Sequence, residues 1–519
     1  MTALTYLVFT AQGQKDPARD FGNTIKAEDL KKHLTIVAGA EMEGRETGTP
    51  GQRKAAAYIE QQFRQIGLLA PEGLTGYQQF FPLYTDSMVS SELLIGNRKA
   101  VYGTDYYVQV SKNRSCSVSA NSLVFVGYGI SEPAYDDYAG KDVKGKIVVM
   151  FTGEPKVDGQ FLVTGNSSFS DYTYPGIEKK SEVARKKGAA GMIVVQQGAK
   201  ELSLSLVAAN SKSAIYYPRT EDSPLNSVVM PTARAIAFFP EWKMDSLVKK
   251  AGRNRPLNTE YCSELTNTYT FNYVNDHNLV QASNVIGIIP GSDLRDEYIY
   301  ITAHYDHLGK RGNKIYYGAD DDGSGTCAVI EMAEAFALAK KAGQGPRRTV
   351  VFMTVSGEEK GLWGSEYYTD HPLFPLDKTS VDLNIDMVGR KDPNRKEGDN
   401  NNYVYVIGHD KLSSELPVIN EGVNDKYTKL EFDYKYDEPN DPEQIFYRSD
   451  HYNFAKKGVP ILFFFDGIHE DYHKTTDTVD KINFDLYEKR IRMIFHTAWE
   501  IANRKEMVKR DKPLPIMIR

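Results

Sequence analysis

The sequence predicts an α/β protein with a central sheet covered by helices on both faces. From residue 284 onward, predicted strands alternate with predicted helices. The run 349–355 (TVVFMTV) is apolar throughout, which is typical of a strand buried on both faces. The length of 519 residues exceeds that of one compact core and therefore predicts two or more domains.

Hydrophobic patterning assigns the elements of this second half. Strands are expected at 284–289, 298–303, 348–354, 381–385, 403–407 and 459–465, and helices at 324–341, 411–423, 450–457 and 484–503. Ligands of such sheets bind beyond the carboxyl ends of the strands. His304, Glu358-Glu359 and Asp386 each follow a predicted strand, so this edge of the sheet is the predicted site.

The N-terminal part, residues 26–68, is predicted to be helical with one break. The break is a glycine-rich loop at 43–51 (EGRETGTPG). The helix after it carries apolar residues at spacings of three and four and ends at a capping glycine, Gly67. We interpret it as an amphipathic surface helix.

Residues 117–261 are predicted to form an inserted unit with its own elements. Strands are predicted at 122–127, 146–151, 192–195 and 235–239, a helix at 178–187, and a short helix after Pro240. The segment holds no group of His, Cys or paired acids with the spacing of metal ligands. It is therefore predicted to be a lid or recognition module rather than the catalytic part.

Composition excludes several classes of protein. Hydrophobic residues make up 41% and charged residues 25%, as in ordinary globular proteins. A net charge of −6 gives no electrostatic footprint for nucleic acid. No run of about 18 apolar residues exists, so no membrane span is predicted.

The first residues predict an export signal. The short apolar run at 4–10 (LTYLVFT) precedes Ala11-Gln12-Gly13, a small-x-small pattern like a cleavage site, although a basic start is missing. A disordered terminus or a first strand is the alternative. We therefore expect an exported protein, whether periplasmic, secreted or at the cell surface.

Three cysteines cannot form a disulfide framework, and no C-x-x-C pair predicts a thiol metal site. Cys327 lies in an apolar helical pattern and is expected to be buried. Cys116 and Cys262 flank the inserted segment and could bridge in an exported protein.

The motif His304-Tyr305-Asp306-His307 follows the strand at 298–303. Alternate residues of an extended segment point the same way, so Asp306 can reach the far nitrogen of His304 and fix its tautomer. A simple surface hydrogen bond between the two side chains is the alternative.

Three consecutive acids, Asp320 to Asp322, lie in a glycine-rich turn and repel one another unless a cation compensates. A helix cap or a calcium loop is the alternative. In Ser356-Gly357-Glu358-Glu359, adjacent glutamates at a strand end project differently, so one can bind metal while the other moves a proton. A solvated acidic turn is the alternative there.

Single groups complete the predicted site. Asp386 ends another apolar strand, and His473 lies in a loop after strand 459–465. His469 competes with His473 for the role of ligand on spacing alone. Oxygen and nitrogen ligands from five segments predict a pair of divalent cations, most simply zinc, with cobalt or manganese as possible substitutes.

Taken in order, these motifs resemble metallopeptidase family 28, the co-catalytic di-zinc exopeptidases. The matching motifs are HYDHLG, GADDDGSG, SGEE, NIDM, SDH and YHKTTDT. The stretches KDVKGKIV at 141–148 and GAAGMIVV at 188–195 resemble the protease-associated (PA) domain. The resemblance implies a three-layer α/β/α zinc-exopeptidase domain with a mixed sheet and an inserted, smaller β-rich α/β PA domain. The expected parts are an export signal or disordered terminus at 1–23, peptidase segments at 24–116 and 262–519, and the PA-like domain at 117–261.

The resemblance also implies roles for individual residues. One zinc would be held by His304 and Asp386, the other by Glu359 and His473, with Asp321 bridging both. Glu358 would be the general base and acid, and Asp306 would support His304. Substrate-pocket residues would be Tyr447, Arg448 and Asp450.

The implied activity is release of the N-terminal residue from peptide substrates. Carboxypeptidase or dipeptidase action of the same family remains open, as do a glutaminyl-cyclase-like aminoacyltransferase and a binding protein with structural metals. The sequence leaves the oligomeric state and the side-chain preference open.

Overall fold

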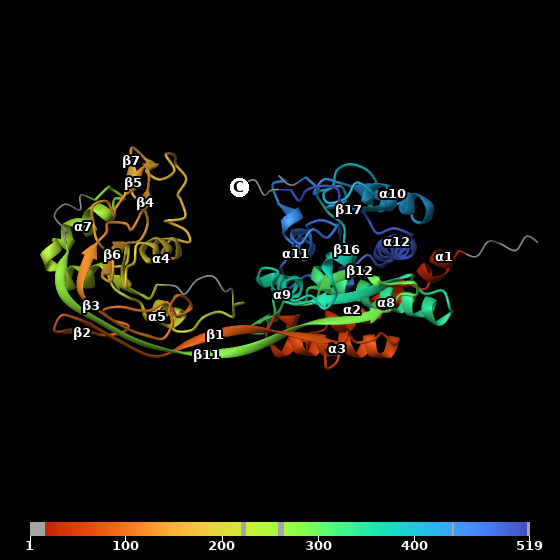
Figure 1. The fold of residues 1–519 in the computed structure, drawn as a ribbon, viewed down its shortest axis with the longest axis horizontal. Helices are drawn as coiled ribbons and strands as arrows, with labels where there is room; N and C mark the ends of the chain where they lie inside the picture. The colour runs from red at the N-terminus through yellow and green to blue at the C-terminus, as the bar shows by residue number, and fades with distance from the viewer. Residues whose placement is uncertain (1–15, 219–224, 258–263, 439–440, 516–519) are drawn as a thin grey trace, which may run out of the picture. The chain divides into compact units, whose positions relative to one another are not determined.

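The computed structural model describes residues 16–218, 225–257, 264–438 and 441–515, which form two compact units (Figure 1). Unit 1 joins the chain up to Pro82 to the chain from Gln281, and unit 2 is Leu83–Val280. Unit 2 is longer at both ends than the inserted segment 117–261 predicted from the sequence. The difference arises because most of strand β1 (Gln78–Ile95) and the first part of strand β11 (Leu265–Ile289) belong to unit 2, although both strands lie outside 117–261.

Unit 1 contains a mixed sheet. Its strand order is β11-β15-β12-β16-β19-β17-β18. The pairs β15–β12, β12–β16 and β16–β19 are parallel, whereas β11–β15 and β17–β19 are antiparallel. The bounds are β12 (Leu294–His304), β15 (Arg348–Val355), β16 (Thr379–Ile385), β17 (Tyr403–Ile407), β18 (Glu431–Asp433) and β19 (Ile461–Phe465).

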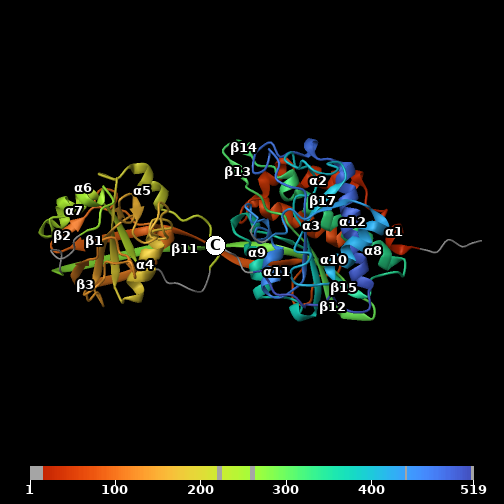
Figure 2. The same cartoon turned by 90° about the horizontal axis from the view of Figure 1, so that it is seen from above.

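Helices cover both faces of this sheet, and the predicted three-layer α/β/α arrangement is confirmed (Figure 2). One face packs against α2 (Ala27–Val37), α3 (Pro50–Ile66), α8 (Gly325–Lys341), α10 (Leu416–Tyr427) and α12 (Phe484–Asn503). The other packs against α9 (Trp363–Asp370) and α11 (His451–Lys456). Along β12, Ile299 and Ile301 belong to the first core and Tyr300 to the second, as expected for a strand buried on both faces.

Most elements of unit 1 lie where the sequence predicts them. The predicted helix 484–503 coincides with α12. The predicted helix 411–423 begins later, at Leu416, because Pro417 favours the first turn of a helix. The predicted break at 43–51 is real, since the short 3₁₀ helix η1 (Ala40–Arg45) separates α2 from α3. Gly67 ends α3 with a φ of 89°, as expected for a glycine cap.

Unit 2 has a sheet of order β10-β9-β6-β3-β11, and β1 pairs with β11 and β2. Its main strands are β2 (Arg98–Ala100), β3 (Cys116–Phe125), β6 (Ile147–Phe151), β9 (Gly191–Gln196) and β10 (Ser227–Pro231). Its helices are α4 (Ile177–Lys186), α5 (Leu204–Asn210), α6 (Thr232–Phe238) and α7 (Met244–Ala251). Two-residue strands in the chain are β4 (Ser131–Glu132), β5 (Tyr135–Asp136), β7 (Lys156–Val157), β8 (Gln160–Phe161), β13 (Lys310–Arg311) and β14 (Lys314–Ile315).

The strand predicted at 235–239 is wrong, because these residues lie largely in α6 and the strand is the preceding β10. A short apolar run fits a buried helix as well as a strand, so its pattern does not separate the two.

Several further predictions concern the ends and the cysteines. Most of the proposed export signal, residues 1–15, lies outside the described residues, while α1 (Pro17–Gly22) packs on α12. Cys262 also lies outside them, so its pairing with Cys116 stays a prediction. Cys327 is buried, as predicted. Within the described ranges, no helix has the length and apolar character needed to cross a membrane.

Candidate metal centre

The predicted site lies at the carboxyl ends of three neighbouring parallel strands. β12 pairs with β15 on one side and with β16 on the other. His304 is the last residue of β12, Glu358 and Glu359 follow β15, and Asp386 follows β16. Parallel pairing therefore brings these four side chains to one edge of the sheet, as the sequence predicts.

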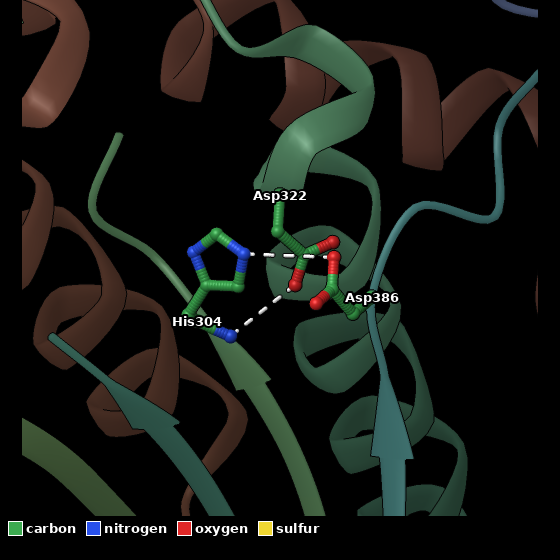
Figure 3. Close-up of side chains that lie close together, drawn as sticks. All are labelled: His304, Asp322 and Asp386. Carbon is green, nitrogen blue, oxygen red and sulfur yellow. Dashed lines mark hydrogen bonds and ion pairs between the residues drawn. The ribbon is translucent and has the colours of Figure 1, made fainter. Parts of the chain in front are cut away.

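His304 faces the carboxylates with one nitrogen and the backbone with the other. Its Nε2 lies 3.2 Å from Asp321 Oδ1. The same nitrogen lies 3.5 Å from Asp386 Oδ1 (Figure 3). Its Nδ1 lies 3.1 Å from the backbone carbonyl of Asp306, with the Asp306 carboxylate at 3.8 Å. A carbonyl only accepts, so Nδ1 carries the proton and Nε2 offers a lone pair. The nearer partner of His304 Nδ1 is thus the main-chain carbonyl of Asp306 rather than its carboxylate.

Asp321 lies between two groups of side chains. Its Oδ1 faces His304, and its Oδ2 lies 3.1 Å from His473 Nε2. The same His473 nitrogen lies 3.1 Å from Glu359 Oε2. One carboxylate therefore joins the pair His304 and Asp386 to the pair Glu359 and His473.

Asp322 lies beside His304 and Asp386, and backbone amides hold both of its oxygens. Its Oδ1 accepts from the amides of Gly325 at 2.8 Å and Met387 at 3.1 Å. Its Oδ2 accepts from the amide of His304 at 3.2 Å (Figure 3). These contacts tie the start of α8 to the ends of β12 and β16. The interpretation as a helix cap thus fits Asp322.

Asp320 is also held by protein groups. Its Oδ1 accepts from the amide of Gly389 at 2.7 Å, and its Oδ2 lies 3.2 Å from His469 Nε2. His469 is thereby paired with Asp320, while His473 faces Asp321 and Glu359. Of the three acids, Asp321 is the one whose two oxygens face the cluster, and of the two histidines, His473 is the one that reaches it.

The cluster fits cations. Five of its buried atoms make no hydrogen bond of good geometry within the described part of the chain: His304 Nε2, His307 Nδ1 and Nε2, Asp321 Oδ2 and Glu359 Oε1. Burial alone would lower the pKa of His473, but its close contacts with the Asp321 and Glu359 carboxylates raise it to about 10. Buried carboxylates that attract positive charge, beside imidazoles whose proton a metal ion can replace, suit zinc or a similar divalent ion.

His307 was not predicted as a site residue. It is fully buried, and its Nδ1 lies 2.8 Å from Glu359 Oε1 and 3.8 Å from Asp321 Oδ2. Together with these two acids it forms a second possible metal-binding group, beside that of His304, Asp322 and Asp386. A second histidine three positions after His304 was the signal that could have identified it.

Glu358 lies beside the cluster but outside the two groups. Its Oε2 is 3.9 Å from His304 Nε2, and its amide donates to Asp306 Oδ1 at 3.2 Å. Burial, with the charges of Glu359 and Asp386, raises its pKa well above the ordinary value, although His304 opposes the shift. A carboxyl group whose pKa is raised above the ordinary value holds a proton more readily, as a group that accepts and returns one must.

A pocket opens next to Asp321, Glu358 and Asp386. Its remaining lining is mainly apolar, with polar groups from Arg448, Ser449 and Tyr472; the apolar residues are Met387, Ile445, Phe463, Phe465 and Ile468. Arg448 Nη2 donates to Tyr472 Oη at 3.2 Å. The pocket combines an acidic end with an apolar end and one cationic side chain.

The three predicted pocket residues differ in position. Arg448 lines the pocket, whereas Tyr447 and Asp450 are buried and do not line it. Asp450 accepts a hydrogen bond from Ser365 Oγ at 2.5 Å. Burial raises the pKa of Asp450 to about 7. Asp450 thus contributes charge beneath the site, away from the pocket wall.

An α/β/α domain with this arrangement of carboxylates and imidazoles is typical of metal-dependent hydrolases. Residues 284–498 match the sequence model of peptidase family M28, and residues 106–233 match that of the PA domain. The first region therefore belongs to peptidase family M28, and the second is a PA domain. The predicted metallopeptidase family and the PA domain are both confirmed.

Individual relatives agree with this assignment. The glutamate carboxypeptidase 2 homolog of Caenorhabditis elegans is 24% identical over 72% of this chain and 53% of its own length. Aminopeptidase YwaD of Bacillus subtilis is 34% identical over 21% of this chain and 22% of its own. The chain thus spans about half of the first relative and less of the second. A solved aminopeptidase from Aneurinibacillus sp. strain AM-1 shares the fold, with a TM-score of 0.51, 20% identity and coverage of 96% of this chain and 100% of its own.

Proposed function

We propose that this protein is a di-zinc exopeptidase that releases the N-terminal residue of peptides. The observation that carries the proposal is the position of Asp321, whose two oxygens face His304 and His473 separately. Membership of residues 284–498 in peptidase family M28 supports the reaction class.

The ligand sets follow from the two groups of side chains. His304 and Asp386 would hold one zinc, Glu359 and His473 the other, and Asp321 would bridge them. When bound, the two ions supply a Lewis acid for the scissile carbonyl and lower the pKa of the attacking water.

Glu358 is the proton carrier in this proposal. It lies beside His304 at the mouth of the pocket and is not needed for either ligand set. Its carboxylate takes a proton from the attacking water and returns it to the leaving amine. The support of Asp306 keeps the His304 ring in the orientation and tautomer described above.

The pocket lining and the relatives favour aminopeptidase action. Asp321 and Asp386 at the polar end of the pocket are assigned to the metals, whose charges offset theirs, and Glu358 is the remaining carboxyl group there. The apolar wall beyond them accepts an uncharged side chain. The names of relatives such as aminopeptidase YwaD support the same choice.

Metal analysis and a substrate panel test the proposal together. The purified protein should contain two zinc ions per chain and hydrolyse aminoacyl-anilides with apolar side chains. A chelator should abolish hydrolysis, and added zinc, cobalt or manganese should restore it. Failure to bind metal after incubation with divalent ions would remove the proposal.

Carboxypeptidase or dipeptidase action is the second candidate, and Arg448 favours it. Its guanidinium is a cationic group of the pocket wall and could bind a free carboxylate. The relative from Caenorhabditis elegans is named a glutamate carboxypeptidase 2 homolog. N-acetylated dipeptides separate the two candidates, because a carboxypeptidase cleaves them and an aminopeptidase does not.

A cyclase and a binding protein would each give a different readout. A glutaminyl cyclase would convert N-terminal glutamine without net hydrolysis, and a binding protein with structural metals would give no turnover. We further propose export, on the basis of the apolar run at 4–10, and a lid or recognition role for the PA domain. Sequencing the N-terminus of the mature protein tests export.

A further inference from the structure

We infer that the segment Arg45-Glu46-Thr47 is the positioning element that fixes the loops bearing the metal ligands relative to one another. The segment belongs to the glycine-rich loop that the sequence showed between two helices, to which the proposed reaction assigns no role. The inference rests on the proposed function, because it concerns the same metal centre. Each of the three side chains contacts a different part of that centre.

Arg45 joins two ligand-bearing loops through their carbonyl groups. It is fully buried, and its Nε donates to Tyr305 O at 2.7 Å. Its Nη1 and Nη2 donate to Tyr317 O and Gly318 O, each at 2.8 Å. Tyr305 is the residue after His304, and Gly318 lies just before the three acids. One rigid guanidinium therefore sets the spacing between the loop of His304 and the loop of Asp321.

Arg45 differs from most buried arginines because its hydrogen-bond partners are backbone carbonyl groups and not carboxylates. It forms no ion pair within the described residues, and its fourth hydrogen bond goes to Val37 O at 2.8 Å. All of these hydrogen bonds thus go to main-chain oxygens. The Arg45 side chain therefore holds the backbone of the two loops and does not contact the side chains of the proposed metal ligands. A buried cation below a group of acids also offsets part of their repulsion.

Thr47 fixes the carboxylate that supports His304. Its hydroxyl donates to Asp306 Oδ2 at 2.6 Å and lies 3.2 Å from Ser356 Oγ. The other oxygen, Asp306 Oδ1, accepts from the amide of Glu358 at 3.2 Å. Asp306 is thereby held on one side by Thr47 and on the other by the turn that carries both glutamates.

Glu46 contacts that same turn from its other end. Its Oε1 lies 2.9 Å from Lys360 Nζ, and Lys360 directly follows Glu359. The Glu46 carboxylate also accepts from Arg311 at 2.6 and 3.0 Å, a bidentate pair on the chain that follows His307. Glu46 therefore joins the segment after β12 to the segment after β15.

The backbone of this loop has an uncommon conformation. Glu43, Gly44 and Arg45 have φ values of 51°, 70° and 51° in succession. A Cβ at Gly44 would lie 2.4 Å from Gly309 O, and the amide of Gly309 donates to Gly44 O at 2.9 Å. Left-handed residues other than glycine are strained, because their Cβ crowds the following carbonyl oxygen. Such a conformation persists where surrounding contacts impose it, as they do here.

A purely structural role and a positioning role predict different measurements. A structural role predicts that loss of these contacts lowers the free energy of unfolding of the metal-free protein. A positioning role predicts a loss of zinc affinity larger than any fall in the stability of the metal-free protein can account for. Replacement of Arg45 would confound the two, so the test uses Thr47 and Glu46.

The experiment measures zinc affinity by competition with a chromophoric chelator, and the melting temperature in EDTA. Thr47→Val should weaken zinc binding about 10–100-fold, the usual effect of losing a partner that orients a ligand, and Thr47→Ser should restore it. Glu46→Gln should weaken zinc binding about 10-fold. Thr35→Val removes a hydroxyl that donates within α2, and Glu60→Gln removes an ion pair to Arg64; both controls should bind zinc normally.

The outcomes separate this inference from the proposed function. If the unmodified protein binds no zinc, the proposed function fails. If it binds two zinc ions and Thr47→Val and Glu46→Gln bind them equally well, the positioning role alone is overturned. A variant that loses zinc only in proportion to a lower melting temperature in EDTA would also overturn it, because the role would then be structural.

Discussion

Glu358 Oε2 and His304 Nε2 lie 3.9 Å apart, and both side chains are largely buried. The contact joins a proposed proton carrier to a proposed metal ligand across the ends of the neighbouring strands β12 and β15. A carboxylate at this distance is close enough to hydrogen-bond to a water molecule beside His304, and it is not needed as a metal ligand.

Glu358→Gln is therefore expected to lose turnover but keep its metals. The amide retains the shape of the side chain but cannot accept a proton. The value of kcat should fall about 10²–10⁴-fold, while zinc content, measured by elemental analysis, stays at two per chain. Glu334→Gln on the exposed side of α8 is the matched control and should behave as the unmodified protein. Near-normal turnover in Glu358→Gln would exclude the proposed role.

Substitutions of Asp321 and Asp322 should have different effects on zinc binding and stability, because the two carboxylates have different contacts. Asp321→Asn removes the carboxylate whose two oxygens face His304 and His473, so at least one zinc should be lost. Asp322→Asn should keep its zinc but lower the free energy of unfolding by about 1–3 kcal/mol, because an amide NH₂ would face a backbone donor. Zinc analysis and urea unfolding measure the two effects. Equal zinc loss in both variants would contradict the bridging role of Asp321.

The sequence was sufficient to predict which side chains meet at one edge of the sheet, for a simple physical reason. A strand buried on both faces must be apolar, so a polar residue at its end stands out, and parallel strands align these ends. His304, Glu359 and Asp386 were found in this way. His473 could not be separated from His469 by spacing, because only the folded loop places Asp320 beside His469.

The role of the glycine-rich loop could not be predicted. Arg45 donates to carbonyls 260 to 273 positions away in the chain, and a carbonyl is common to every residue, so the pattern of side chains carries no trace of the contact. The same limit applies to the predicted strand at 235–239. Its apolar residues suit either secondary structure, and the choice depends on packing within unit 2.

His307 should matter for the metal group that contains Glu359. Its Nδ1 lies 2.8 Å from Glu359 Oε1 in a fully buried position. His307→Asn should weaken the binding of one zinc about 10–100-fold, because that oxygen loses the group that orients it. A stepwise zinc titration would measure the change. The control is His33→Asn, which removes another imidazole–carboxylate contact, to Glu331 at 3.3 Å. Two unchanged binding steps in His307→Asn would contradict this prediction.

His496 should make a contribution to stability that is lost in mild acid. Burial lowers the pKa of His496 from 6.5 to about 4, and its ring stacks on Tyr427 with centroids 4.0 Å apart. Between these two pH values, the unfolded chain binds a proton that the folded chain does not. The contribution is therefore complete above pH 6.5 and is lost as the pH falls towards 4.

At pH 5, the free energy of unfolding should be about 2 kcal/mol lower than at pH 8 on account of this one side chain, since each pH unit below 6.5 costs about 1.4 kcal/mol. Urea unfolding of the metal-free protein at both pH values measures the loss. His496→Phe retains a ring against Tyr427 but has no group to protonate, so its loss between pH 8 and pH 5 should be smaller by that amount. His451, whose pKa burial lowers to about 3, and the acidic groups titrate in both proteins and cancel in the difference. An equal loss in both proteins would show that His496 is protonated in the folded state as readily as in the unfolded chain.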